Sequence, residues 1–423
     1  MSGSLHPREL VDFCLARINQ FDDRLRAWVL VDADGARREA DRLGELARRG
    51  EWLGPLHGIP IGIKDIVDVR GWPTRAGSPL RGETPAAADA PVVRRLREAG
   101  AILLGKTVTT EFACFDPPPT RNPWDLNRTP GGSSSGSAAA VAMEMCMAAI
   151  GSQTGGSITR PASFCGVAGL KASHGAVLLA GVVPISPRLD HVGPIGRSAL
   201  DLAAVWGAIA DNREGDALLA AVLEMPLKLA VIESFFMETA ADEVRRATRE
   251  AIDLICGRGK GERFELPPSF ADLATMHRRI MAYDAAAYHR AAFEQSPERF
   301  GPHVRGLIEF GLAITADQYA EAVAHQRRCR AEFAALLPPG RIAVTPATRT
   351  TAPTPETTGD PAFNSPWSYT GLPTVSIPCA VLTDGLPVSL QLIGGPQSEQ
   401  QLLATAASGE PLLAFHNRPP LLT

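Results

Sequence analysis

Two short clusters of glycine and serine lie close together in the first half of this 423-residue chain. The first cluster reads GGSSSGS over 131–137, and the second reads SQTGGS over 152–157. A thirteen-residue apolar run, interrupted only by Glu144, separates them. Glycine lets the backbone approach a ligand closely, and serine supplies hydroxyl groups. We therefore expect the two clusters to build one site.

The second cluster is suited to holding negative charge. Two glycines before a serine leave successive backbone N–H groups free to point at one spot, where an anion or the oxyanion of a transition state could be held. Ser157 would then be the nucleophile. A plain turn and a phosphate-binding loop are the alternatives, but the GxxxxGK[ST] pattern is absent and no GxGxxG follows a predicted strand.

A nucleophilic serine needs a base, and the sequence offers two kinds. Histidine is the usual base, although no GxSxG motif is present. The histidine candidates are His57, His174 and His191. The other candidate is Lys64, one of only five lysines among the 42 lysine and arginine residues. It ends the apolar run GIPIGIK, where burial would let a lysine lose its proton, which an arginine does not. A hydroxyl of the first cluster could relay the proton.

The intervening run has to bring the two clusters together. We expect a buried helix over residues 137–149, which would advance about 20 Å. The roughly eight residues that follow can span about 26 Å when extended. The chain can therefore return Ser157 to the start of this helix, beside Ser133.

Helical and strand patterns alternate along the rest of the chain, which predicts an α/β fold with a mostly parallel or mixed sheet. Helices are expected over 8–50 (two amphipathic helices), 91–99, 242–255, 316–337 and 397–407. Strands are expected over 59–63, 101–104, 229–232, 342–346, 374–377 and 388–393. Irregular segments rich in proline or glycine are expected over 116–127 and 182–201.

Several longer motifs resemble the amidase signature family, whose site is a Ser–cisSer–Lys triad. They are GIPIGIKDIVDV, TPGGSSSGSAAAVA, QTGGSITRPASFCGVAGLK, LDHVGPIGRSALDLA, YTGLPTVSIPCAV and GLPVSLQLIGG. The resemblance implies an α/β fold, a three-layer α/β/α sandwich around a large mixed sheet. It also implies a single domain over 1–423. Its parts would be N-terminal helices at about 8–50, a signature core at about 55–210, a variable, mostly helical region at about 213–338, and closing strands and a helix at 340–423.

Carried onto this chain, the triad of the family is Lys64 as base, Ser133 as relay and Ser157 as nucleophile. The family's relay serine follows a cis peptide bond, here Gly132–Ser133, and Ser134 is the alternative relay. The oxyanion would be held by the backbone N–H groups of Thr154, Gly155, Gly156 and Ser157. The resemblance implies no metal and no organic cofactor.

The sequence differs from the family's common DTGGSIR pattern at two positions. Gln153 stands where the aspartate is usual, and Arg160 follows the nucleophile by three residues instead of two. This QTGGSITRP form is more similar to malonamidase and its relatives, in which an arginine at that spacing holds the substrate carboxylate. Arg160 is therefore expected to bind substrate together with Ser134 and Gln153. Pairing of Arg160 with a buried acid such as Asp190 is the alternative.

The resemblance implies an amidase that hydrolyses a small carboxamide, with a carboxylate on the substrate as one option, to a carboxylate and ammonia or an amine. The reaction would pass through an acyl-enzyme on Ser157. The first alternative is an amidotransferase A-type subunit that releases ammonia within a tRNA-dependent complex. The second is a Ser/His hydrolase that depends on His174 or His191, and the third is a binding module without turnover.

Composition argues against several classes of protein. The net charge of −4 does not predict electrostatic binding to nucleic acid. The N-terminus lacks a secretory pattern, and no uncharged apolar run reaches the ~18 residues that span a bilayer. Seven scattered cysteines without a CxxC pair suit reduced thiols. We expect a cytoplasmic enzyme with a small-molecule amide substrate and no nucleic-acid or membrane partner; a homodimer is left open.

Further reactive or bulky side chains are expected to have supporting roles. The core or the hydrogen-bond framework is expected to hold Cys165, Lys106 and Lys171. By family position, the acyl pocket is expected to be lined by Phe115, Trp124 and Tyr369. Helical faces are expected to present two histidines to solvent, His289 and His325.

Overall fold

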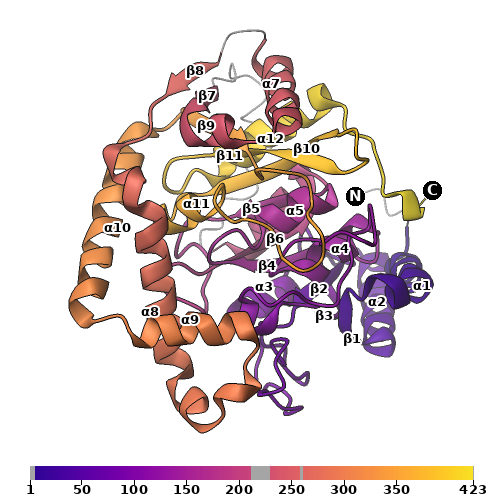
Figure 1. Ribbon diagram of the computed structural model, residues 1–423. Helices are drawn as coiled ribbons and strands as arrows, with labels where there is room; N and C mark the ends of the chain where they lie inside the picture. Colours follow the sequence, from indigo (N-terminus) through magenta and orange to yellow (C-terminus); the bar gives the residue numbers. More distant parts are fainter. Residues whose placement is uncertain (1–4, 211–228, 258–260, 423) are drawn as a thin grey trace.

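The computed structural model describes residues 5–210, 229–257 and 261–422. Eleven strands of this part form one sheet (Figure 1), in the order β1-β3-β2-β4-β6-β5-β10-β11-β9-β7-β8. The strands are β1 Trp28–Val31, β2 Pro60–Lys64, β3 Ile102–Thr107, β4 Ala148–Gln153, β5 Ala168–Lys171, β6 His191–Gly196, β7 Leu229–Ile232, β8 Glu262–Phe264, β9 Ile342–Pro346, β10 Thr374–Val381 and β11 Pro387–Ile393. β2 is parallel to β3 and β4, β7 is parallel to β8 and β9, and the other neighbours are antiparallel. The sheet is therefore mixed.

Helices connect and cover these strands. They are α1 Pro7–Leu25, α2 Ala33–Arg48, α3 Pro91–Glu98, α4 Ser135–Ala142, α5 Thr159–Cys165, α6 Ala199–Ile209, α7 Asp242–Cys256, α8 Leu273–Gln295, α9 Pro302–Leu312, α10 Ala316–Leu336, α11 Ser365–Thr370 and α12 Glu399–Leu413. In Figure 1, α8, α9 and α10 form a group at one side of the sheet. α8 packs against α9, α10 and α11.

Alternate residues of the central strands enter separate hydrophobic clusters on the two faces of the sheet. In β3, Ile102 and Leu104 belong to the cluster that includes residues of α1, α2, α4 and α5. Leu103 belongs to the cluster that includes residues of α6, α7 and α12. Because successive side chains of a strand point to opposite faces, helices cover both faces. The predicted three-layer α/β/α sandwich is confirmed.

Most of the predicted elements are present within a few residues of their expected bounds. The helix expected over 137–149 is wrong in extent, because α4 ends at Ala142 and β4 begins at Ala148. The turn between them contains Glu144, which has a left-handed φ of 55° and pairs with Arg17 at 3.1 Å. Periodicity does not distinguish a buried helix from a buried strand in an apolar run. Glu144, the only charged residue of the run, lies at the turn and was the one signal for it.

The segment 182–201 is less irregular than expected. It contains β6 and the start of α6, and β6 pairs with both β4 and β5. Its sequence, HVGPIG, carries the proline and glycines that argue against a central strand. The short strand β1 was not expected either. The first part of the expected variable region, 213–228, lies outside the described residues.

Candidate active site

The ends of two parallel strands place the two Gly/Ser clusters together. β2 ends at Lys64, and its parallel neighbour β4 ends at Gln153. Parallel strands present their carboxyl ends at one edge of a sheet, where ligands bind in open α/β folds. The first cluster leads into α4 and the second leads from β4 into α5. The clusters meet as expected, and the extended return is strand β4, which begins at Ala148 within the expected helix.

Lys64 lies at the centre of this meeting point and is fully buried. Its Nζ lies 2.7 Å from Ser133 Oγ, 2.8 Å from Ser152 Oγ and 3.0 Å from Ser134 Oγ. Burial lowers the pKa of Lys64 well below its usual range, and the charge of Asp190 opposes this only in part. A neutral amine donates two hydrogen bonds and accepts one, so three hydroxyl neighbours suit it.

The hydrogen bonds of the two neighbouring serines differ. Ser134 Oγ donates to the carbonyl of Ser152 at 3.2 Å and accepts from the Ser152 N–H at 3.2 Å. The proton of Ser134 is therefore already engaged. Within the described residues, Ser133 Oγ has one hydrogen-bond partner, Lys64 Nζ, so its proton is available for transfer. The peptide bond Gly132–Ser133 is cis, as the family resemblance implied.

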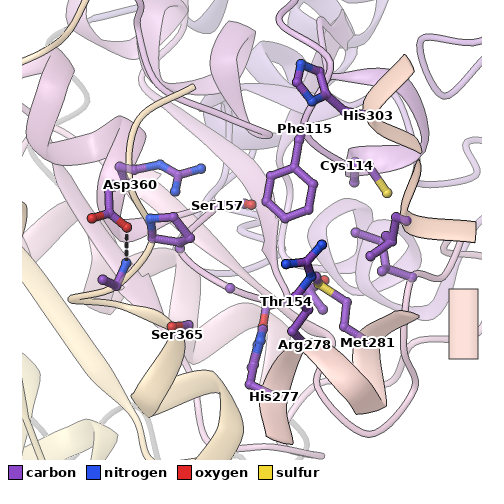
Figure 2. A pocket seen from close by; sticks show the side chains of 18 of the residues that line it. Cys114, Phe115, Thr154, Ser157, His277, Arg278, Met281, His303, Asp360 and Ser365 are labelled. Atoms are coloured by element: carbon purple, nitrogen blue, oxygen red, sulfur yellow. Dashed lines mark hydrogen bonds between the residues drawn. The ribbon is translucent and has the colours of Figure 1, made fainter. Parts of the chain in front are cut away.

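Ser157 lies at the cavity and not in the lysine cluster. Its exposed fraction is 9%, and it lines a cavity of about 520 Å³. Figure 2 shows Ser157 at the middle of this cavity, with Phe115, Arg278 and His277 around it. The N–H of Ser134 donates to the Ser157 carbonyl at 3.3 Å, which joins the two clusters. Among the described residues, no hydrogen bond links Ser133 Oγ with Ser157 Oγ.

Every carbonyl group of the loop before Ser157 has its own partner. Thr154 O lies 2.9 Å from His277 Nε2, Gly155 O accepts from Ser368 Oγ at 2.8 Å, and Gly156 O accepts from the Arg160 N–H at 2.9 Å. The N–H of a trans peptide points opposite to its carbonyl. In the described part of the chain, the N–H groups of Gly155, Gly156 and Ser157 donate to no protein acceptor. They are left for a ligand in the cavity.

Arg160 is the expected substrate-binding residue that lines the cavity. Its Nη2 donates to Gly132 O at 2.7 Å and to Thr358 Oγ1 at 3.3 Å, while Nε and Nη1 have no partner in the described residues. Burial lowers the pKa of Arg160 to about 10, so it remains charged at neutral pH. Pairing with Asp190 does not occur, because Asp190 accepts from the Thr154 hydroxyl and from the N–H groups of Ile185 and Ser186.

The other two expected substrate-binding residues are placed behind the cavity wall. Ser134 and Gln153 are fully buried and are not among the cavity-lining residues. Gln153 Oε1 accepts from the N–H groups of Ile158 and Thr159, at 2.9 and 3.0 Å, and its Nε2 donates to Ser368 Oγ at 3.3 Å. Both residues therefore contact the loops of the site rather than the space a substrate would fill.

The remaining candidates divide between the cavity and the core. Phe115 lines the cavity, whereas Trp124 and Tyr369 do not. The histidines considered as bases, His57, His174 and His191, are not cavity-lining either. Cys165, Lys106 and Lys171 are buried in the core. Lys106 pairs with Asp65 at 2.8 Å, and Lys171 donates to Ala172 O. The expectation that His289 and His325 face solvent is wrong, since their exposed fractions are 5% and 3%.

Three residues of the site were not singled out from the sequence. Ser152 contacts Lys64, and its position in the second cluster was a signal for it. His277 and Arg278 reach the cavity from α8, in the region with the weakest family resemblance. Their places depend on how α8 packs, which no motif in the sequence indicates.

The comparisons with known proteins agree with this architecture. A family model described as Amidase matches residues 9–403. Curated relatives include the A-type subunit of glutamyl-tRNA(Gln) amidotransferase from Chloroflexus aggregans, 33% identical over 99% of this chain and 96% of the relative. The same protein from Prochlorococcus marinus is 36% identical over 96% and 93%. These relatives belong to amidotransferases and are not malonamidases.

Solved structures are similar over nearly the whole chain. One is described as "An unexpected vestigial protein complex reveals the evolutionary origins of an s-triazine catabolic enzyme", with a TM-score of 0.90, 30% identity and coverage of 97% and 96%. The peptide amidase of Stenotrophomonas maltophilia has a TM-score of 0.83, 29% identity and coverage of 100% and 96%. The chain therefore belongs to the amidase signature family and is a hydrolase of amide C–N bonds.

Proposed function

We propose that this protein hydrolyses a small carboxamide to a carboxylate and ammonia or an amine through an acyl-enzyme on Ser157, with Lys64 as base and Ser133 as relay. The observation that carries the proposal is the buried Lys64 amine, 2.7 Å from a serine hydroxyl that has no other partner in the described residues. An amine whose pKa is lowered by burial can accept a proton at neutral pH.

The contact between Lys64 and Ser133 supports the first proton transfer, and the transfer from Ser157 to Ser133 is part of the proposal. Lys64 takes a proton from Ser133, which takes one from Ser157 as Ser157 Oγ attacks the amide carbonyl. The N–H groups of Gly155, Gly156 and Ser157, with that of Thr154, hold the oxyanion, and one such donor typically contributes ~2.7–4 kcal/mol. Ser133 then returns the proton to the leaving nitrogen. Water hydrolyses the acyl-enzyme by the reverse route.

Two settings for this chemistry are supported by different observations. The names of the curated relatives favour the first alternative given in the sequence analysis, an ammonia-releasing A-type subunit of an amidotransferase. The peptide amidase among the similar structures, and the unpartnered nitrogens of Arg160 at the cavity, support a free-standing amidase for a small amide, malonamidase-like in its use of that arginine. The comparisons weigh more towards the amidotransferase, and both settings share the acyl-transfer step.

Ammonia release by the purified chain distinguishes the two settings. A free-standing amidase releases ammonia from small amides at the same rate with or without other proteins. An amidotransferase component releases it slowly alone, and purification of the tagged chain from its own cells recovers stoichiometric partner chains. A homodimer, which the sequence left open, would be found by measuring the mass of the purified protein in solution.

The role of Arg160 is tested with a pair of amides, one acidic and one neutral, of similar size. A hydrogen bond to a charged group contributes about 1.5–3 kcal/mol, so Arg160→Gln should raise KM for the acidic amide by about 10- to 100-fold. The neutral amide is the control for any disturbance of Gly132, which Arg160 also contacts. Equal effects on the two amides would rule out carboxylate binding.

A further inference from the structure

A histidine from α8 holds the loop that precedes the nucleophile. His277 Nε2 lies 2.9 Å from Thr154 O, and a carbonyl oxygen can only accept, so Nε2 carries the hydrogen. Burial lowers the pKa of His277, so the ring is neutral and its tautomer is fixed by this bond. His277 is 6% exposed, and Figure 2 shows it reaching Thr154 at the cavity.

This bond determines the direction of a neighbouring N–H group. The Thr154 carbonyl and the Gly155 N–H belong to one planar trans peptide, so they point in opposite directions. With the carbonyl directed at His277, the N–H is directed away from α8 and has no protein acceptor in the described residues. His277 thereby sets the orientation of a donor without touching the substrate at that donor.

Few other contacts restrain this peptide, although Ser368 holds the carbonyl of the next one, Gly155 O. A Cβ placed on Gly155 would meet only Pro361 Cβ at 3.7 Å and His277 Cε1 at 4.0 Å, which are ordinary contacts. The Thr154 side chain is tied to Asp190, but that bond does not fix the peptide that follows. Glycine also permits both signs of φ. Without His277, the Thr154–Gly155 peptide would be able to rotate.

We propose that His277 is a positioning residue for amide hydrolysis: its Nε2–H holds the Thr154 carbonyl and thereby aims the Gly155 N–H at the oxyanion. This inference rests on the proposed function, because it requires an oxyanion formed by attack of Ser157. It extends that function by tying the oxyanion site to α8, the helix that also contributes Arg278 and Met281 to the cavity. Helix α8 of the variable region then supports the chemical step.

Three substitutions at one position separate this role from other roles. The amide nitrogen of glutamine can occupy the place of Nε2, whereas that of asparagine is too short to reach Thr154, and leucine has no donor. We expect His277→Leu and His277→Asn to lower kcat about 100-fold with KM for the amide within about threefold of wild type. His277→Gln should recover most of kcat. The matched control is His289→Leu, a buried histidine of the same helix that does not line the cavity.

The outcomes distinguish this inference from the proposed function. An inactive Ser157→Ala protein together with full activity in His277→Leu would overturn the role of His277 and leave the proposed function intact. A His277→Gln protein as inactive as His277→Leu, at an unchanged melting temperature, would show proton transfer by the ring and would also overturn positioning. Activity that survives Ser157→Ala would overturn the proposed function itself. If His277→Leu does not fold, the Gln and Asn variants test the inference. A higher kcat in His277→Gln than in His277→Asn supports positioning, and an equal or lower kcat overturns it.

Discussion

At the scale of single residues, the proposed mechanism requires Lys64 to be neutral. Lys64 has no acidic hydrogen-bond partner in the described residues, only serine hydroxyls. Lys106 is the informative contrast, because it is equally buried but pairs with Asp65 at 2.8 Å, which favours its charged form. Burial lowers the pKa of both lysines, but among the described residues only Lys106 has a carboxylate in direct contact that opposes this effect.

The pH dependence of activity should report this neutral lysine. Because burial lowers the pKa of Lys64, the base is available at neutral pH and is lost as the pH falls through that lowered pKa. We expect kcat/KM to rise with pH to a plateau reached well below 10.5, the pKa of an exposed lysine. If kcat/KM rose only as the pH approached 10.5, Lys64 would not be the base.

Replacement of Lys64 by arginine tests the same point by a different route. Arginine stays protonated, so Lys64→Arg should lose about 10²- to 10⁴-fold in kcat at every pH, the contribution typical of a general base. Circular dichroism would check that the fold is retained. Recovery of activity at high pH in Lys64→Arg would contradict the assignment.

At the scale of elements, the sequence predicted the types of most helices and strands but not the division of the apolar run. The bounds of strands such as β7 and β9 match those expected from the sequence. The run between the Gly/Ser clusters was not divided, because an all-apolar segment has no period that separates helix from strand. The residues of the proposed triad came from motifs; Lys64 and Ser133 are in contact, and Ser157 lines the cavity. His277 was missed because its contact to Thr154 joins segments 123 residues apart.

The close approach of α4 to its neighbours gives an element-scale prediction. A Cβ on Gly136 would lie 2.2 Å from Ala27 O and 2.4 Å from the Val108 nitrogen, both backbone atoms. Gly136→Ala should therefore lower the free energy of unfolding by about 1–3 kcal/mol, as overpacked substitutions do. Denaturant unfolding measures this loss. Gly82, whose Cβ would meet nothing within 4 Å, is the control, and an equal effect of Gly82→Ala would contradict the packing argument.

At the scale of the whole molecule, one sheet joins the early and late parts of the chain. β5 pairs with β10 although they lie far apart in the sequence, and the hydrophobic cluster on one face contains residues from Leu56 to Leu413. The site uses this continuity, because Lys64 and Ser157 come from the early part and Ser368 from the late part. Within the described residues we find no helix with the length and hydrophobicity of a membrane-spanning segment.

The shared sheet and core lead us to expect one folding unit. Thermal unfolding should be a single cooperative transition, with the same midpoint by far-UV circular dichroism and by tryptophan fluorescence, since coincident transitions indicate two-state behaviour. Tryptophans report from both halves, among them Trp28 and Trp367, which are 8% and 0% exposed. Two separated transitions would divide the chain into independent domains.

The central claim is that amide hydrolysis passes through an ester on Ser157. The most direct measurement is mass spectrometry of the protein quenched in acid during turnover of a slowly hydrolysed amide, followed by peptide mapping. We predict an added mass equal to the acyl group on the peptide containing Ser157, absent in Ser157→Ala. Two results would contradict this claim. One is an acyl group attached to another residue, such as Cys165, and the other is an unchanged turnover rate in Ser157→Ala.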